Sequence, residues 1–220
     1  MSVPAATEST PSLDRAARRR SLAADALNIP NLLTMGRIAM IPAFLFYLHR
    51  GTAKDGLWAA ILFTLAALTD MLDGYLARKL DIVSVLGKFL DPLADKLIVM
   101  AGLIWMVPMG RIPAWAVVVL LAREISVTGL RSVAASEGVV IAAGQEGKTK
   151  TALQMIGIIA LIIGYPYQMS YFGMDLGVID FVHVGQLLVY ISLVFSVASA
   201  AQYVKLFASA VEAKDKRQEH

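Results

Sequence analysis

The chain has 220 residues, of which 57% are hydrophobic and 17% are charged, and its mean hydropathy is +0.64. This composition lies outside the range of soluble globular domains and is typical of a single domain with several membrane-spanning segments. The absence of cysteine excludes disulfide bonds and thiolate metal sites. The pI near 9.2 does not indicate nucleic-acid binding, because the basic residues flank apolar segments, where they set topology and attract anionic lipids.

The first 27 residues are expected to form a cytoplasmic segment outside the membrane domain. Residues 1 to 11 are rich in Ser, Thr, Pro and Ala, which favours disorder. From Ser12 to Leu27 small and apolar residues oppose several arginines, and this pattern predicts an amphipathic helix in the membrane interface. A disordered basic tail is the alternative interpretation of the same residues.

Six apolar segments between residues 28 and 210 predict an all-α integral membrane domain with six transmembrane helices. Each segment approaches or exceeds the ~20 residues needed to cross a bilayer, and turn-forming residues separate them. The expected helices run from Leu32 to Leu48, Leu57 to Ala77, Leu86 to Val107, Ile112 to Leu130, Thr151 to Tyr167 and Phe181 to Phe207. The fourth helix could instead end at Ser136, and we expect Asp180 and His183 to cap the sixth. A charged cytoplasmic tail, residues 211 to 220, follows.

Six crossings place both ends of the chain on one side of the membrane. In this topology 17 of the 20 basic residues lie on the side of the two ends, and only Arg50, Lys54 and Arg111 lie on the other. Because positive residues concentrate in cytoplasmic segments, both ends are predicted to be cytoplasmic.

Four aspartates stand at the predicted cytoplasmic ends of the second and third helices, where an unpaired carboxylate in hydrocarbon costs at least about 2.5 kcal/mol. Asp70 and Asp73 are three residues apart, and Asp91 and Asp95 are four apart, so each pair falls on one helical face. Two such faces can converge on one or two hard cations that prefer oxygen ligands. Mg2+ and Mn2+ are the simplest candidates.

Structural ion pairing of these aspartates with Arg78, Lys88 and Lys96 is the alternative explanation. It does not explain the glycines at Gly74 and Gly87, since glycine in a helix costs roughly 1 kcal/mol relative to alanine. Glycine would instead let a bulky ligand approach the backbone beside the acids. A metal and ligand site is therefore the favoured hypothesis.

Two further polar clusters are candidates for binding. Near the start of the first helix Asn31, Thr34 and Arg37 recur one turn apart on one face, which favours nucleotide or phosphate contact over simple capping and snorkelling. In the fourth and fifth helices a basic cluster predicts a pocket for the phosphate of a second substrate. Its members are Arg123, Arg131, Lys148 and Lys150. Positive-inside anchoring explains the lysines in part, but not the deeper Arg123.

The aspartate segment as a whole, D-x2-D-G-x2-A-R-x8-G-x3-D-x3-D, resembles the signature of the CDP-alcohol phosphotransferases, which are integral membrane enzymes that make phospholipid head groups. The resemblance implies that Asp70, Asp73 and Asp91 are metal ligands and that Asp95 is the general base, with a share in metal binding. It also implies a pocket for the CDP part of the donor. The residues assigned to donor binding are Asn31, Thr34, Arg37, Gly74, Ala77, Arg78 and Gly87.

The basic cluster resembles that of one branch of this family. Enzymes of this branch transfer a phosphatidyl group from CDP-diacylglycerol to sn-glycerol 3-phosphate and release CMP. What the resemblance implies is a homodimer in the cell membrane of a bacterium, surrounded by membrane lipids, with the active site on the cytoplasmic side and two Mg2+ or Mn2+ ions. Phosphatidylglycerol or inositol phosphate as the acceptor remains the alternative within the family. A cation transporter is a distant alternative, since transporters place acidic residues near the midplane of the membrane.

Overall fold

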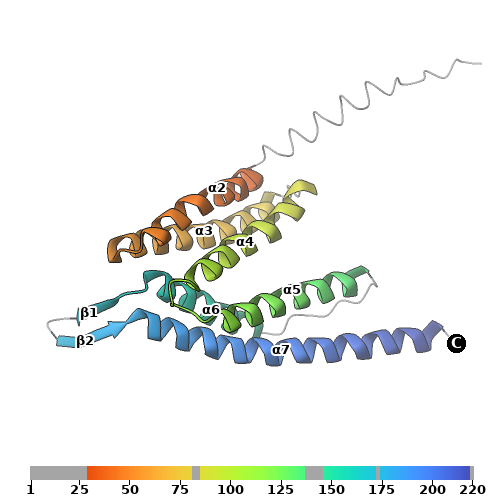
Figure 1. The fold of residues 1–220 in the computed structure, drawn as a ribbon. Coiled ribbons are helices and arrows are strands. Elements are labelled where there is room, and N and C mark those ends of the chain that lie inside the picture. Colours follow the sequence, from red (N-terminus) through yellow and green to blue (C-terminus); the bar gives the residue numbers. More distant parts are fainter. Residues whose placement is uncertain (1–28, 81–84, 137–145, 172–173, 219–220) are drawn as a thin grey trace, which may run out of the picture. The chain divides into compact units, whose positions relative to one another are not determined.

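The computed structural model describes residues 29–80, 85–136, 146–171 and 174–218, and within them the chain is mostly helical (Figure 1). The elements in chain order are α2 (Ile29–Arg50), α3 (Ala53–Leu80), α4 (Val85–Met106), α5 (Ala114–Ser136), α6 (Glu146–Ile163), β1 (Pro166–Tyr171), β2 (Met174–Asp180) and α7 (Phe181–Gln218). The six described helices coincide with the six predicted apolar segments. The amphipathic helix predicted from Ser12 to Leu27 lies outside the described residues.

Three of the described helices are long and apolar enough to cross a membrane. The candidate spans are Asn31–Arg50, Ala53–Leu72 and Phe181–Ser209, and α6 contributes a shorter apolar stretch, Thr151–Ile163. At its end α7 continues to Gln218, so the helix includes most of the predicted charged tail. The described residues thus contain three candidate spans, where the sequence predicts six crossings.

The segment after α6 forms a β-hairpin, so the prediction of a purely α-helical chain with a helix reaching Tyr167 is wrong here. Helix α6 ends at Ile163 because Gly164 adopts a left-handed φ of 62°, and its N–H donates to the carbonyl of Ala160 at 3.0 Å. Pro166 then begins β1, which pairs antiparallel with β2. The hairpin reverses the chain and leads it into α7.

The chain divides into two compact units. The first, Met1–Pro42 with Thr64–Ile98, contains the start of α2, the later part of α3 and the first part of α4, and with them the aspartate motif of residues 70–95. The second, Ala43–Phe63 with Val99–His220, contains α5, α6, the hairpin and α7.

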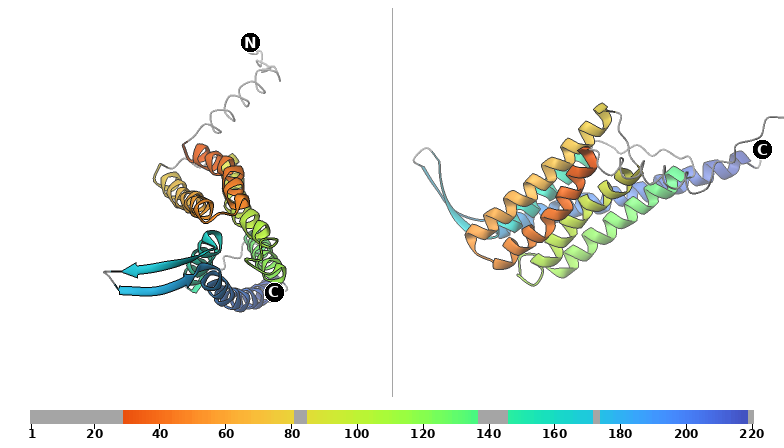
Figure 2. Two further views of the ribbon diagram at one scale, coloured as in Figure 1. Left: turned by 60° about the vertical axis from the view of Figure 1, so that its left-hand side comes forward. Right: turned by 90° about the horizontal axis from the view of Figure 1, so that it is seen from above.

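Within the second unit, helices α6 and α7 run antiparallel and approach each other closely at two glycines. A Cβ added at Gly157 would lie 2.9 Å from the Val189 side chain, and one added at Gly185 would lie 2.7 Å from the Leu161 side chain. Small residues at a crossing bring two helix backbones together, a packing mode common between membrane helices. Helix α5 also packs on α7, and the two helices run in the same direction (Figure 2).

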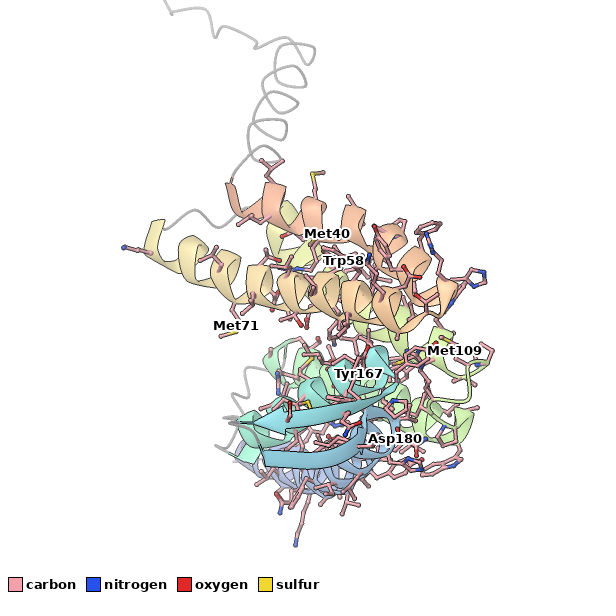
Figure 3. The ribbon with its side chains drawn as sticks, turned by 90° about the vertical axis from the view of Figure 1, so that its left-hand side faces the viewer. Met40, Trp58, Met71, Met109, Tyr167 and Asp180 are labelled. Carbon is pink, nitrogen blue, oxygen red and sulfur yellow. The ribbon has the colours of Figure 1, made fainter. Side chains whose placement is uncertain are left out.

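The described helices carry large apolar side chains on their outer faces. Met71 is 73% exposed and points away from α3 (Figure 3), and Val194 on α7 is 69% exposed. Similar side chains are exposed along α2 and α5. A soluble protein rarely exposes so much contiguous apolar surface, so these faces suit a lipid environment.

Candidate active site

The start of α2 turns a polar face inward. Asn31, Thr34 and Arg37 recur every three residues, and their exposed fractions are 2%, 0% and 1%. The structure thus confirms that the three side chains share one face. Burying polar and charged groups costs free energy unless they are bonded, so such a face needs partners from neighbouring elements or from a ligand.

Arg37 meets the aspartate motif directly. Its Nη1 donates to Oδ1 of Asp70 on α3 at 2.6 Å, a short charge-assisted bond, while 37% of the Asp70 side chain stays exposed. The sequence placed Arg37 against the donor substrate and did not predict this pairing. A buried guanidinium that holds one carboxylate oxygen restricts the orientation of the Asp70 side chain.

The other three aspartates are placed by their helices. Asp73 follows Asp70 within α3, and Asp91 and Asp95 lie four residues apart in α4. Asp95 is exposed and has a polar interaction of its own. The side chains of Asp73 and Asp91 lie outside the described part of the structure. The same holds for four predicted donor-binding residues, namely Gly74, Ala77, Arg78 and Gly87.

The predicted acceptor cluster is described in part, on α5. Arg123 is mostly buried, with 14% of its side chain exposed, and its Nη1 donates to Glu124 at 2.7 Å. Its Nε is buried without a hydrogen-bond partner among the described residues. Arg131, two turns further along, is exposed. The side chains of Lys148 and Lys150, which belong to the first turns of α6, lie outside the described part.

Two buried hydroxyls on α7 were not predicted from the sequence. Ser196 is 1% exposed and Tyr203 is 9% exposed, and neither hydroxyl has a hydrogen-bond partner among the described residues. Their spacing of seven residues in an apolar helix puts them on one face. This spacing is the sequence signal for the pair, but serine and tyrosine are also common packing residues in membrane helices, so the spacing alone does not indicate a functional site.

A second group of polar residues, the capping region, is bonded mainly to backbone at helix ends. Buried Arg111 donates to the carbonyls of Leu161 and Ile162 at the end of α6, at 3.0 and 2.6 Å. Burial lowers the pKa of Arg111, and the electrostatic interaction and hydrogen bond with Tyr165 oppose that shift. Gly164 leaves no room for a side chain there, since an added Cβ would fall within 2.5 Å of the guanidinium.

Asp180 completes this capping region at the start of α7, as the sequence predicted. Its Oδ1 accepts the N–H of Val182 at 2.8 Å, and its Oδ2 lies 2.7 Å from Nδ1 of His183. The hydrogen bond with His183 lowers the pKa of Asp180, and the backbone N–H groups act in the same direction. Figure 3 labels Asp180 together with Tyr167 on β1, whose hydroxyl donates to the carbonyl of Ala53 at 3.0 Å.

The aspartate motif and its surroundings match a known family. The family model described as CDP-alcohol phosphatidyltransferase matches residues 27–198. The chain belongs to this family. The match includes the polar start of α2, the aspartates of α3 and α4, and the basic residues of α5 and α6, so the sequence-based resemblance is confirmed.

Three curated relatives of the chain carry one of two names. The CDP-diacylglycerol–glycerol-3-phosphate 3-phosphatidyltransferase of Bacillus subtilis (strain 168) is 46% identical over 158 residues, which cover 66% of this chain and 82% of the relative. The protein of that name from Rickettsia bellii is 36% identical over 180 residues, 81% of this chain and 94% of the relative. A probable phosphatidylglycerophosphate synthase of Mycobacterium tuberculosis is 39% identical over 136 residues, 60% of this chain and 64% of the relative.

Whether the motif suits a divalent cation depends on its donor atoms. The described residues contain no group of three side chains able to hold a metal ion, and only Asp70 and Asp95 of the four predicted ligands are described with their side chains. Carboxylate oxygens are the ligands that Mg2+ and Mn2+ prefer, and both of these side chains are accessible. The two described carboxylates of this CDP-alcohol phosphatidyltransferase are therefore of the donor type that a hard divalent cation takes.

Proposed function

We propose that the chain is a CDP-diacylglycerol–glycerol-3-phosphate 3-phosphatidyltransferase. It would transfer the phosphatidyl group of CDP-diacylglycerol to sn-glycerol 3-phosphate, giving phosphatidylglycerol phosphate and CMP. The observation that carries the proposal is the 46% identity to a relative of that name over most of the relative's length. The buried polar face of α2 and its bond to Asp70 supply the physical basis for a charged substrate at this end of the helices.

The donor would bind beside the aspartate motif. Arg37 orients Asp70, and the buried Asn31 and Thr34 present further hydrogen-bonding groups on the same face of α2. The proposed CDP pocket also uses Gly74, Ala77, Arg78 and Gly87, where small residues allow close approach and a guanidinium pairs with phosphate oxygens.

Asp70, Asp73, Asp91 and Asp95 would hold one or two Mg2+ or Mn2+ ions. Bound there, the metal supplies charge neutralisation for the pyrophosphate of the donor and for the departing phosphate of CMP. Four carboxylates close to a polyanion would otherwise repel it, which is the physical reason to expect metal dependence.

Asp95 would act as the general base. It takes the proton of the acceptor hydroxyl as that oxygen forms a bond to the phosphorus linked to diacylglycerol. The bond between this phosphorus and the bridging oxygen of the pyrophosphate breaks, and CMP leaves with that oxygen. The exposure of Asp95 on α4 supports this role, because a base that meets a water-soluble acceptor must be reachable.

The acceptor's phosphate would be held by Arg123, Arg131, Lys148 and Lys150. Arg123 supports this assignment best, since a mostly buried guanidinium with an unbonded Nε is suited to an anionic oxygen. Arg131 is exposed and would contribute to phosphate binding through its charge at longer range.

We further propose a membrane domain of residues 28–210 with six crossings, an interfacial segment before it and a charged tail after it. Both ends and the active site would face the cytoplasm of a bacterium, and two copies would form a homodimer. The absence of cysteine makes the topology directly measurable with single introduced cysteines. Lys54→Cys and Ser209→Cys, both at exposed positions, should react with a membrane-impermeant maleimide from opposite sides. If both cysteines were labelled from the same side of the membrane, the chain could not cross it an odd number of times between residues 54 and 209.

The activity is tested with purified protein, CDP-diacylglycerol and a panel of acceptors. Glycerol 3-phosphate should release CMP and yield phosphatidylglycerol phosphate, detected by mass spectrometry, while phosphatidylglycerol and inositol phosphate should yield little product. EDTA should stop the reaction, and added Mg2+ or Mn2+ should restore it. Faster turnover with another acceptor would overturn the acceptor assignment and leave the family unaffected.

A further inference from the structure

Helix α7 carries two buried hydroxyls that its own backbone does not satisfy. The serine one turn earlier, Ser192, is equally buried, but its Oγ donates to the carbonyl of Val189 at 2.7 Å. Ser196 and Tyr203 have no such bond among the described residues. A buried hydroxyl without a partner loses about 1–3 kcal/mol relative to water, so a recurring pair on one face needs an explanation.

The contact between α5 and α7 places these hydroxyls at a similar height along the helix axes to Arg123. Trp115 of α5 stacks on Tyr190 of α7 with ring centroids 5.6 Å apart, and the two helices run in the same direction (Figure 2). Eight residues after Trp115, a rise of about 12 Å, the chain reaches Arg123. The same rise from Tyr190 ends between Ser196 and Tyr203. Long helical side chains point back toward the helix start in both helices, so the Tyr203 hydroxyl comes toward the level of the Arg123 backbone and the Arg123 guanidinium comes toward the level of Ser196.

The contact between α6 and α7 brings the start of α6 to the same level. Gly157 of α6 lies against Gly185 and Val189, and the two helices are antiparallel. Eleven residues before Gly157 is Glu146, the first residue of α6. Eleven residues after Gly185 is Ser196. The N–H groups and the positive dipole end of α6 are therefore level with the unbonded hydroxyl of Ser196.

We propose that Ser196 and Tyr203 donate hydrogen bonds to the phosphate monoester of the acceptor, together with Nε of Arg123 and the start of α6. This inference rests on the proposed function, because it adds two specificity-determining residues to the acceptor site. Two hydroxyls, each with one O–H to donate, a guanidinium nitrogen and the N–H groups of a helix start together supply several hydrogen-bond donors, which suits an anion with several acceptor oxygens. A hydroxyl acceptor without phosphate would leave these donors unbonded.

The test removes each hydroxyl without changing the side chain's shape. In Ser196→Ala and Tyr203→Phe, the KM for glycerol 3-phosphate should rise about tenfold or more, as expected when a hydrogen bond to a charged group is lost. The KM for CDP-diacylglycerol should stay within about twofold. Inorganic phosphate serves as a second probe, and its inhibition constant and its thermal stabilisation of the protein should weaken in parallel.

Matched controls come from the same helix. Ser192→Ala removes a buried hydroxyl that is already bonded within α7, and Tyr190→Phe keeps the ring that stacks on Trp115. Both should retain the parent's KM for glycerol 3-phosphate. An unchanged KM in both Ser196→Ala and Tyr203→Phe would overturn the inference, as would a raised KM with unaltered phosphate inhibition.

The outcomes separate this inference from the proposed function. If the parent turns over glycerol 3-phosphate and the two variants match it, the proposed function holds and the hydroxyls are structural. If the parent does not use glycerol 3-phosphate, the proposed function fails, and phosphate stabilisation still tests the site directly. Equal stabilisation by phosphate in parent and variants would then overturn the inference.

Discussion

The charged groups of the aspartate motif and those of the capping region have different kinds of hydrogen-bond partner. In the capping region, charged side chains form hydrogen bonds with backbone groups at helix ends. Arg111 donates to two carbonyls of α6, and Asp180 accepts from N–H groups at the start of α7. In the aspartate motif, Arg37 instead bonds a carboxylate side chain in another helix, and that carboxylate stays partly exposed. Bonds to helix-terminal backbone stabilise the fold, whereas Asp70 is held by a buried arginine and keeps part of its carboxylate accessible for ligand chemistry.

This contrast predicts two kinds of mutant. Substitutions in the aspartate motif should remove activity with a smaller effect on stability, because the acids are held for a ligand. Substitutions in the capping region should lower the melting temperature while the remaining folded protein keeps its activity. An aspartate-motif mutant that lost mainly stability, or a capping-region mutant that lost mainly activity, would contradict this distinction.

The largest effect is expected for the proposed metal ligands. Asp70→Asn, Asp73→Asn and Asp91→Asn preserve side-chain size but remove the ligand charge, so each should nearly abolish CMP release. Asp55→Asn is the matched control, since Asp55 is also on α3 but bonds Thr52 and Arg50 at the helix start. It should lower stability and retain turnover. Near-normal activity in any two of the three motif variants would refute the metal assignment.

The next effect separates the base from the metal ligands. Asp95→Asn should lower kcat by about 10²–10⁴-fold, the usual contribution of a general base, while the affinity for CDP-diacylglycerol is retained. Binding of the donor is measured independently of turnover, for example by thermal stabilisation. A parallel collapse of donor affinity would make Asp95 chiefly a metal ligand.

A smaller effect is expected in the acceptor cluster, where burial distinguishes two arginines. Arg123→Ala removes a mostly buried cation and should reduce kcat/KM by about 10- to 150-fold, corresponding to 1.5–3 kcal/mol for a charge-assisted bond. Arg131→Ala should reduce kcat/KM by a smaller factor, because Arg131 is exposed and solvent screens its charge. The loss should appear mainly in the KM for glycerol 3-phosphate. Lysine at position 123 should restore activity only in part, since it lacks the planar fork.

The capping region should respond in stability instead. Arg111→Met keeps much of the apolar stem but leaves the carbonyls of Leu161 and Ile162 without their donor, which costs about 1–3 kcal/mol for the buried groups. The melting temperature should fall, and kcat at low temperature should be unchanged. Lys54→Met, which removes an exposed cation, is the control and should alter neither. An Arg111→Met protein of normal stability but low activity would show that Arg111 contributes to activity and not to stability.

The sequence predicted the elements whose signals are local. Six apolar runs marked the six described helices, and the capping by Asp180 followed from its place before an apolar run. The helix predicted to reach Tyr167 failed because hydrophobicity continued past Gly164, whose left-handed conformation ends α6. The spacing of the motif identified its aspartates. The pairing of Arg37 with Asp70 depends on helix packing, for which the sequence has no local signal. The seven-residue spacing of Ser196 and Tyr203 puts them on one face, but only the packing of α7 shows that their hydroxyls are buried without a partner among the described residues.

The smallest effect concerns the pH dependence of the cap at Asp180. Its hydrogen bonds with His183 and the backbone lower its pKa below the ordinary 3.8, so the folded state favours the ionised carboxylate. A lowered folded-state pKa contributes stability that is present above the unfolded value and is lost as the pH falls through the folded value. The parent should therefore lose more stability than Asp180→Asn when the pH falls from 5 toward and below 3.8. Thermal melts of both proteins in the same detergent measure this difference, and parallel pH profiles would show that the carboxylate's charge adds nothing to the cap.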